Sequence, residues 1–170
     1  MDTLQLIQLL KEHLRKTFYG VYAEDQLPEV DKRPLAIIVN TDPSHLDGTH
    51  WVAMYLARNK PGEYFDSYGN PPDKPVEDYL NRQSPKGWLY NTRPVQGLFS
   101  TLCGAYCVQY LEARHESKDS FSTLLYTLFP MMNNDNLVQQ RMQEHYNVDV
   151  PIYDPTMKWV FKKKKKQKKQ

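Results

Sequence analysis

The segment VQGLFSTLCGAYC, residues 95–107, decides the fold and carries two groups that thiol chemistry needs. Gln96 lies seven residues before Cys103, so one loop can deliver both side chains beside the same carbonyl group. Beyond the loop, Cys103, Cys107 and Tyr110 recur at helical spacing and share one face. The segment therefore predicts a loop and then a buried helix that starts at Cys103. Backbone N–H groups and the helix dipole at such a start favour a thiolate over a thiol.

A histidine and a carboxylate precede this segment on a predicted hairpin. His50 heads an apolar run at residues 51–57, and the turn NKPG at 59–62 leads into a returning strand at 63–66. His50 and Asp66 lie at similar distances from the turn, so both come to the same end of the hairpin. That register suits a contact between an imidazole and a carboxylate.

Each of these residue types suits one role in thiol catalysis. A cysteine is a weak nucleophile until a base takes its proton, and the base needs an orienting partner. The sequence predicts His50 as the base, Asp66 as its partner and Cys103 as the nucleophile. The Gln96 amide and the Cys103 N–H group would stabilise the oxyanion. Taken singly, each residue suits a buried cysteine, a turn or a loop, and it is the ordered set that favours a protease.

Neighbouring residues have supporting roles in this interpretation. The Trp51 ring is expected to stack on the imidazolium, and Gly104 is expected to let a substrate backbone approach. Cys107 lies one helical turn deeper and is most simply a small buried hydrophobe. A zinc site built from these cysteines with His50 and His115 has only weak support, because no second cysteine pair exists. We expect no metal.

The order His50, Asp66, Gln96, Cys103 resembles the adenovirus protease (adenain) family and its relatives, the SUMO-specific proteases. The resemblance is carried by the motifs AIIVNT (36–41), GTHW (48–51), YFDSYG (64–69), VQG (95–97) and CGAYC (103–107). It implies an α+β fold with a central, mostly antiparallel sheet flanked by helices, and with the catalytic cysteine at the N-terminus of a buried central helix. Adenain-like enzymes often carry Glu where this chain has Asp66, but either carboxylate can orient an imidazole.

The resemblance also implies a function and a setting. It implies a thiol protease, a hydrolase that cleaves precursor proteins, such as virion or capsid proteins, after small residues such as Gly during viral maturation. The chain would then be a product of a virus or of a virus-like mobile element. Adenovirus proteases are stimulated by DNA and by a peptide tethered through a cysteine that precedes the catalytic Gln. No cysteine precedes Cys103 here, so that tether cannot form. Noncovalent activation by a peptide, or no peptide at all, stays open, and no cofactor is required.

Composition fits one domain with a basic tail. Hydrophobic residues make up 40% of the 170 residues, enough for a core, and we expect a single protease domain over residues 1–161. No apolar run is long enough for a membrane span, and we expect a monomer without a membrane partner. Two cysteines at i and i+4 are too few for a disulfide scaffold and indicate a reducing setting.

Residues 162–170 form a lysine-rich tail that we expect to be disordered. Without it the chain has 15 basic and 20 acidic residues, so a body of about −5 is joined to a tail of +7. DNA binding or nuclear targeting is predicted for the tail, with an inert solubilising tail as the alternative. Localisation to the host nucleus or the virion follows. The lysines concerned are Lys162, Lys163, Lys164, Lys165, Lys166, Lys168 and Lys169.

Two other functions stay open. A deconjugase that releases SUMO-like or ubiquitin-like modifiers uses the same chemistry with a broad docking surface. A noncatalytic nucleic-acid-binding relative would keep the fold, and its Cys103 thiol would have an ordinary pKa.

The remaining elements follow from periodicity and capping residues. The sequence predicts a helix at 4–14 after Asp2, a buried strand at 35–40, a short helix at 76–82 and an edge strand at 88–91. It also predicts helices at 120–128, capped by Ser120, and from 134 or 135 to 143.

Overall fold

Short apolar runs form a five-stranded sheet in the computed structural model, which describes residues 1–154. The strands lie side by side in sequence order. They are β1 (Phe18–Ala23), β2 (Leu35–Asn40), β3 (Trp51–Leu56), β4 (Gly62–Phe65) and β5 (Trp88–Tyr90). The expected antiparallel pairing holds for the three central strands, while β1 pairs with β2, and β4 with β5, in parallel. Parallel neighbours need a crossover, and the long connections 24–34 and 66–87 supply it.

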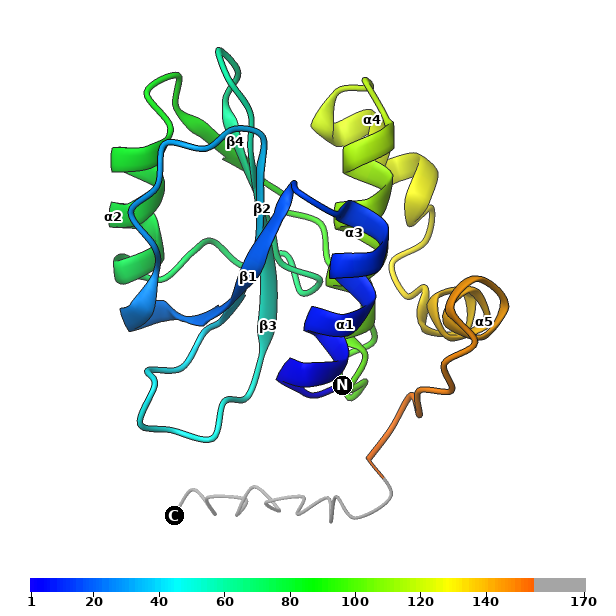
Figure 1. Ribbon diagram of the computed structural model, residues 1–170. Helices are drawn as coiled ribbons and strands as arrows, with labels where there is room; N and C mark the ends of the chain where they lie inside the picture. Colours follow the sequence, from blue (N-terminus) through cyan, green and yellow to red (C-terminus); the bar gives the residue numbers. More distant parts are fainter. Residues whose placement is uncertain (155–170) are drawn as a thin grey trace, which may run out of the picture.

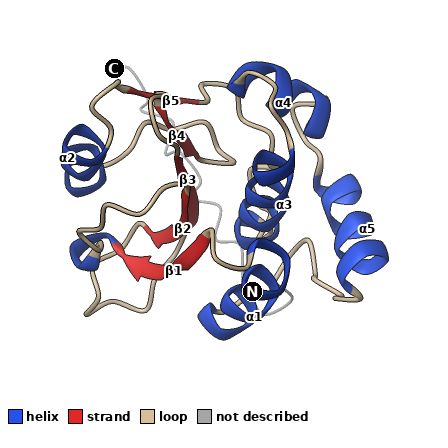
Figure 2. Cartoon of the chain, turned by 45° about the horizontal axis from the view of Figure 1, so that its top comes forward, coloured by secondary structure: helices blue, strands red, loops and turns tan. Residues whose placement is uncertain are grey.

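Helices cover both faces of the sheet and give three layers (Figures 1 and 2). Four lie together on one face: α1 (Thr3–Leu14), α3 (Cys103–Glu116), α4 (Phe121–Leu128) and α5 (Asp135–Tyr146). The opposite face carries α2 (Lys74–Gln83), and the short 3-10 helix η1 (Glu24–Gln26) contacts it. The predicted α+β class with a helix-flanked central sheet is confirmed.

Local sequence signals explain where two of the helices begin. Asp2 caps α1, since its side chain accepts a hydrogen bond from the Gln5 N–H group and the Gln5 side chain accepts one from the Asp2 N–H group. Ser120 caps α4 by accepting from the Thr123 N–H group. Both caps lie where the sequence predicts them.

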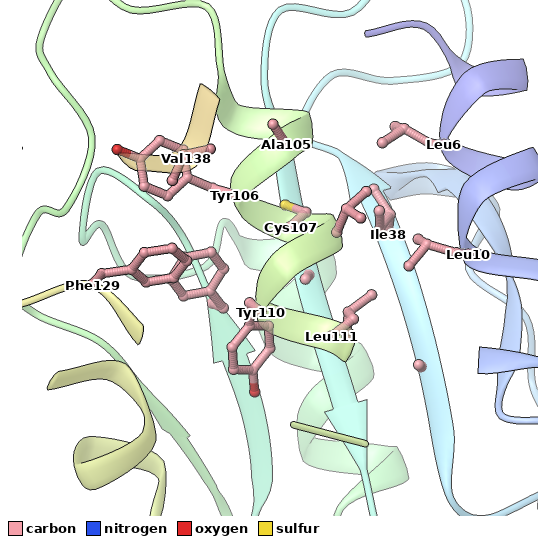
Figure 3. Close-up of a cluster of buried hydrophobic side chains, with 14 of the residues drawn as sticks. Leu6, Leu10, Ile38, Ala105, Tyr106, Cys107, Tyr110, Leu111, Phe129 and Val138 are labelled. Atoms are coloured by element: carbon pink, nitrogen blue, oxygen red, sulfur yellow. The ribbon is translucent and has the colours of Figure 1, made fainter. Parts of the chain in front are cut away.

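Helix α3 is the centre of the larger core, as its apolar sequence predicts. Residues 104–111 are all buried, and Leu6, Ile38, Cys107 and Phe129 pack in the same cluster (Figure 3). The Tyr106 ring packs against Phe129, and the Tyr110 ring stacks on Phe65, which in turn stacks on Phe129. Cys103 is the first residue of this helix, so the packing that buries α3 also holds Cys103 in place.

Strand β1 is not predicted from the sequence. Strand β1, FYGVYA, extends the sheet beyond β2, with an irregular register between Phe18 and Gly20. Its aromatic and β-branched residues are typical of a strand, but Gly20 interrupts the alternation. The lysine-rich tail at 162–170 lies outside the described residues.

Candidate active site

The β3–β4 hairpin brings His50 and Asp66 together, as its register predicts. His50 directly precedes β3, and Asp66 directly follows β4. The imidazole Nε2 lies 2.7 Å from Oδ1 of Asp66, and the two side chains are 15% and 3% exposed. Low exposure strengthens this charge-assisted bond, because water competes for it weakly.

Further hydrogen bonds fix the carboxylate and its backbone. Oδ1 of Asp66 also accepts from the Tyr68 N–H group at 2.8 Å. The Asn91 amide bonds the Asp66 backbone on both sides: its Oδ1 accepts from the Asp66 N–H group at 3.0 Å, and its Nδ2 donates to the Asp66 carbonyl at 2.6 Å. Neither Tyr68 nor Asn91 stands out in the sequence. Together they leave Asp66 little freedom to turn away from His50.

Cys103 and His50 act on each other electrostatically. Burial of the thiol alone would raise its pKa, but the hydrogen bond and the charge of His50, with the N–H groups of Trp51 and Gly104, lower the pKa of Cys103 below its usual value. Burial likewise opposes a charged imidazole, but Asp66 and Cys103 outweigh it and raise the pKa of His50 to about 9. These opposite shifts favour a thiolate–imidazolium pair at neutral pH.

The two ring nitrogens of His50 have different surroundings. Nε2 faces Asp66, whereas Nδ1 is buried and makes no hydrogen bond of good geometry within residues 1–154. Nδ1 is therefore the ring nitrogen that remains free to exchange a proton with the Cys103 thiol. Catalytic hydrogen bonds are often poorly aligned before a substrate binds, and this geometry fits that state.

The ring beside the imidazole is Tyr68, where the sequence pointed to Trp51. The ring centroids of His50 and Tyr68 are 5.0 Å apart. Trp51 turns its indole so that Nε1 donates to the Met1 carbonyl at 3.2 Å. Burial, followed by the negative charge of Cys103, raises the pKa of Tyr68 to about 12, so its hydroxyl stays protonated and donates to the Ser100 carbonyl at 3.0 Å.

Gln96 lies in the loop before α3 and is buried. Its Oε1 accepts from the Ser67 hydroxyl, and its Nε2 donates to the Ser100 carbonyl at 2.9 Å and lies 3.2 Å from the Ser100 Oγ. The backbone N–H group of Gln96 donates to the Ser67 carbonyl at 3.1 Å. Ser67 thus holds Oε1 of the Gln96 amide, and Ser100 lies against Nε2, the end of the amide that donates hydrogen bonds. The role of Gln96 at an oxyanion stays a prediction.

Helix α5 holds the same loop from behind. The Val95 carbonyl accepts from Asn134 Nδ2 and from the Tyr106 hydroxyl, each at 2.9 Å. The same Tyr106 hydroxyl, whose one proton the two acceptors share, lies 2.9 Å from Asp135 Oδ1, and that oxygen also accepts from the Gly97 N–H group at 3.2 Å. A Cβ at Gly97 would lie 2.4 Å from Asp135 Oδ2, so only glycine lets the loop approach α5 this closely. This close approach of the loop to α5 explains why a glycine follows Gln96.

His50 and Cys103 open onto one cleft of about 590 Å³. His50, Trp51, Tyr68 and Cys103 line it, together with residues 98–101 of the loop before α3. Gln96 lies behind this lining, under Ser100. The loop carries the exposed side chains of Leu98 and Phe99, which make one rim of the cleft apolar.

Gly104 packs against the N-terminal segment and β3. It is buried, and the atoms that a Cβ would meet belong to Met1, Leu6 and Trp51 at 3.3–3.4 Å. Its small size therefore lets α1 and β3 pack closely against the start of α3. Room for a substrate backbone stays a prediction.

Cys107 occupies the core, as its position in the helix predicts. It is fully buried, its Sγ lies 3.4 Å from the Trp51 carbonyl, and burial raises the pKa of its thiol well above the usual value. Both cysteines are free thiols. Within residues 1–154, no three His, Cys, Asp or Glu side chains gather so that they could hold a metal ion. None of the helices in that range is long and apolar enough to cross a membrane.

The fold is that of a protease. Two crystal structures of the ASFV pS273R protease, one of them the Se-Met protein, superpose on the chain with TM-scores of 0.58 and 0.61 at 20% and 22% identity. The superpositions cover 82% and 83% of this chain, and this chain spans only 65% and 66% of those proteins. No family model and no curated protein matches the sequence. The chain therefore shares its fold with a viral protease.

Proposed function

We propose that the chain is a cysteine endopeptidase with Cys103 as nucleophile, His50 as base and Asp66 as the orienting carboxylate. The observation that carries the proposal is the 2.7 Å His50–Asp66 bond together with a half-buried cysteine whose pKa is lowered by the same imidazole. A protease fold supports it independently. A cysteine with only a structural role resembles Cys107, whose pKa is shifted in the opposite direction.

The reaction is acyl transfer through a thioester. His50 takes the thiol proton, and the Cys103 sulfur attacks the scissile carbonyl carbon to form a tetrahedral oxyanion. The imidazolium then gives its proton to the leaving amine as the C–N bond breaks. Water, deprotonated by His50, attacks the thioester, and the thiol returns with release of the acid. Asp66 holds the ring in place throughout and keeps the imidazolium stable.

Stabilisation of the oxyanion is assigned to the Cys103 N–H group and the Gln96 amide. The Nε2 group carries two N–H bonds, and the Ser100 carbonyl accepts only one of them. Rotation of the Ser100 hydroxyl away from Nε2 frees the second for a substrate oxygen. The Ser67 hydroxyl keeps Oε1 on the opposite side, so the donor side of the amide stays toward Ser100 and the cleft.

The substrates proposed are precursor proteins of a virus or a virus-like mobile element, cut after small residues such as Gly during maturation. The resemblance of the motifs to adenain supports this class. We further propose that the basic tail binds DNA in the host nucleus or the virion. Asp154 lines the cleft, and Lys162 follows eight residues later, within about 30 Å of extended chain. Nucleic acid held by the tail would thus lie close to the cleft.

A second candidate function is the release of a ubiquitin-like modifier. The observation that favours it is the apolar rim, since Leu98 is 77% and Phe99 50% exposed beside the cleft. Exposed apolar side chains at a cleft suit the docking of a folded protein. The chemistry of Cys103 would be the same.

A comparison of substrates distinguishes the precursor protease from the deconjugase. The wild-type protein is given a peptide library and, separately, folded SUMO-like and ubiquitin-like fusions that end in Gly-Gly. Rapid cuts in peptides after a Gly-containing motif support the precursor protease. Rapid release from a fusion, with slow cleavage of peptides of the same terminal sequence, would instead support the deconjugase.

A further inference from the structure

A cation-lined pocket of about 430 Å³ lies at the far end of the sheet from His50. His50 precedes β3 and Ala57, which lines the pocket, follows it, so the strand separates the two by roughly 20 Å. The pocket is built from the β3–β4 turn, the end of α2 and the turn after it. Its charged lining residues are Arg33, Arg58, Lys60, Arg82, Lys86 and a single acid, Asp31.

The positive charge here contrasts with the rest of the described chain. The 16 residues after Asp154 hold eight of the 22 Lys and Arg and none of the acids, so residues 1–154 carry 14 basic and 20 acidic side chains. Five of those 14 cations line this one pocket, against one of the 20 acids. A body that is acidic as a whole therefore presents one concentrated cationic site.

The two cation-bearing turns are joined rigidly. The Gly62 N–H group donates to the Gly87 carbonyl at 2.9 Å and lies 2.8 Å from the Ser84 Oγ. The Ser84 hydroxyl donates to the same Gly87 carbonyl at 2.6 Å. Because these bonds tie the β3–β4 turn to the turn after α2, the backbone segments that carry the cations are held together before any ligand binds. Such preorganisation lowers the entropic cost of binding.

Three of the cations are available to a ligand. The Arg33 guanidinium donates hydrogen bonds to the carbonyls of Val30, Lys32 and Gln83, and Arg82 forms an ion pair with Glu29 at 2.8 Å, so these two cations already have partners. By contrast, the exposed side chains Arg58, Lys60 and Lys86 make no hydrogen bond or ion pair with any residue in the described part of the chain. Asp31 is the one acid in the lining and Glu63 acts on Lys60 from outside it, so the like charges are only partly balanced, and an anion relieves their repulsion.

We propose that this pocket binds a ligand with several closely spaced phosphate groups. Phosphate fits both the Arg fork and the Lys point charge, and a chain of phosphates concentrates negative charge in a small volume. A carboxylate peptide fits less well, because its charges are spaced by the backbone and the pocket offers few apolar side chains as anchors. The phosphates of a nucleic-acid backbone and a free polyphosphate share this chemistry.

The test uses the full-length chain with inorganic tripolyphosphate, a short DNA duplex and an oligoglutamate peptide. Affinity is measured by titration calorimetry, and amide hydrogen exchange locates the contact apart from the basic tail. We expect tripolyphosphate to protect residues 57–62 and 84–87. We expect the double variant Arg58→Glu/Lys60→Glu to weaken binding about tenfold or more, and Lys86→Glu, on the other turn, to weaken it independently.

The matched control is Lys16→Glu/Lys118→Glu, which changes the net charge equally at exposed sites outside the pocket. It is expected to alter affinity by about twofold at most. A parallel loss for the DNA duplex in the pocket variants identifies a nucleic-acid backbone, and a loss for tripolyphosphate alone identifies a free polyphosphate. Equal losses in the pocket and control variants, no protection of the two turns, or tighter binding of oligoglutamate would each overturn the proposal.

Discussion

Ser67 holds Gln96 by both its side chain and its backbone: its hydroxyl donates to Gln96 Oε1, and its carbonyl accepts from the Gln96 N–H group at 3.1 Å. Ser67 directly follows Asp66, which binds His50. One dipeptide therefore positions both the base and the proposed oxyanion donor. The Ser100 carbonyl can only accept, so it fixes Nε2 as the end of the Gln96 amide that faces it and leaves Oε1 for the Ser67 hydroxyl.

Replacing Ser67 by Ala is expected to lower kcat about tenfold with little change in KM. The substitution leaves Oε1 without its donor, so the amide loses its fixed orientation, whereas Gln96→Ala removes the donor itself and is expected to cost about 10² or more in kcat. Steady-state kinetics on a cleaved peptide measure both. Ser122→Ala, at an exposed serine of α4, is the matched control. An unchanged kcat for Ser67→Ala beside an impaired Gln96→Ala would show that Ser67 does not position the amide.

The thiolate–imidazolium pair predicts an unusual pH profile for alkylation. The pKa of Cys103 is lowered and that of His50 is raised to about 9, so the thiolate persists well below the pH at which an ordinary thiol ionises. Iodoacetamide should therefore modify Cys103 rapidly at pH 7. In His50→Ala the hydrogen bond and the charge of His50 are lost, and only the smaller effect of the Trp51 and Gly104 N–H groups opposes burial, so the pKa of the thiol rises and modification should become fast only above about pH 9.

Cys107 serves as an internal control for this experiment. It is fully buried with a raised pKa, and we expect it to stay unmodified in the folded protein. Peptide mapping by mass spectrometry distinguishes the two sites. Equal rates for wild type and His50→Ala across pH 6–8 would contradict a thiolate stabilised by His50.

Gly97→Ala is expected to weaken both stability and turnover. Its Cβ would lie 2.4 Å from Asp135 Oδ2 and 2.7 Å from Asn133 Nδ2, so the loop must move off α5, at a cost of about 1–3 kcal/mol in the free energy of unfolding. Because Gln96 directly precedes Gly97, movement of the loop also displaces the Gln96 amide, and kcat should fall as well. Denaturant unfolding and peptide kinetics measure the two effects. Leu98→Ala, at an exposed neighbour, should leave stability nearly unchanged, and an equally stable, fully active Gly97→Ala would refute the constraint.

Deletion of residues 162–170 is expected to abolish any stimulation of cleavage by DNA. The tail supplies seven lysines, and contacts of this kind release counterions, so the stimulation in the intact chain should also fall steeply with salt. Peptide cleavage with and without duplex DNA, over a salt series, measures it. Basal cleavage without DNA should be retained. Stimulation that survives the deletion would instead assign DNA binding to the body of the protein.

The hairpin and the central helix could be predicted because their signals are local. The turn at 59–62 sets the register that joins His50 to Asp66, and the apolar run after Cys103 can only form a buried helix. The pairing of the edge strands is nonlocal, and β1 was missed because Gly20 breaks its pattern.

The surroundings of the site depend on long-range contacts that spacing does not encode. Asn91 reaches Asp66 from 25 residues away, and Asp135 reaches Gly97 from 38 residues away. Gly104 likewise serves packing against Met1 and Leu6, which the catalytic motif does not reveal. The residues proposed for the chemistry could be selected from the sequence, whereas those that position them required the structure.

The central claim is tested most directly by the turnover of one peptide library by wild type, Cys103→Ala and Cys107→Ala. The account predicts defined cuts by wild type, the same cuts by Cys107→Ala, and none by Cys103→Ala. Asp66→Ala should retain a small, measurable rate, because the carboxylate only orients and stabilises the base. Wild-type rates in Cys103→Ala would contradict the account, since no other described thiol is exposed to the cleft.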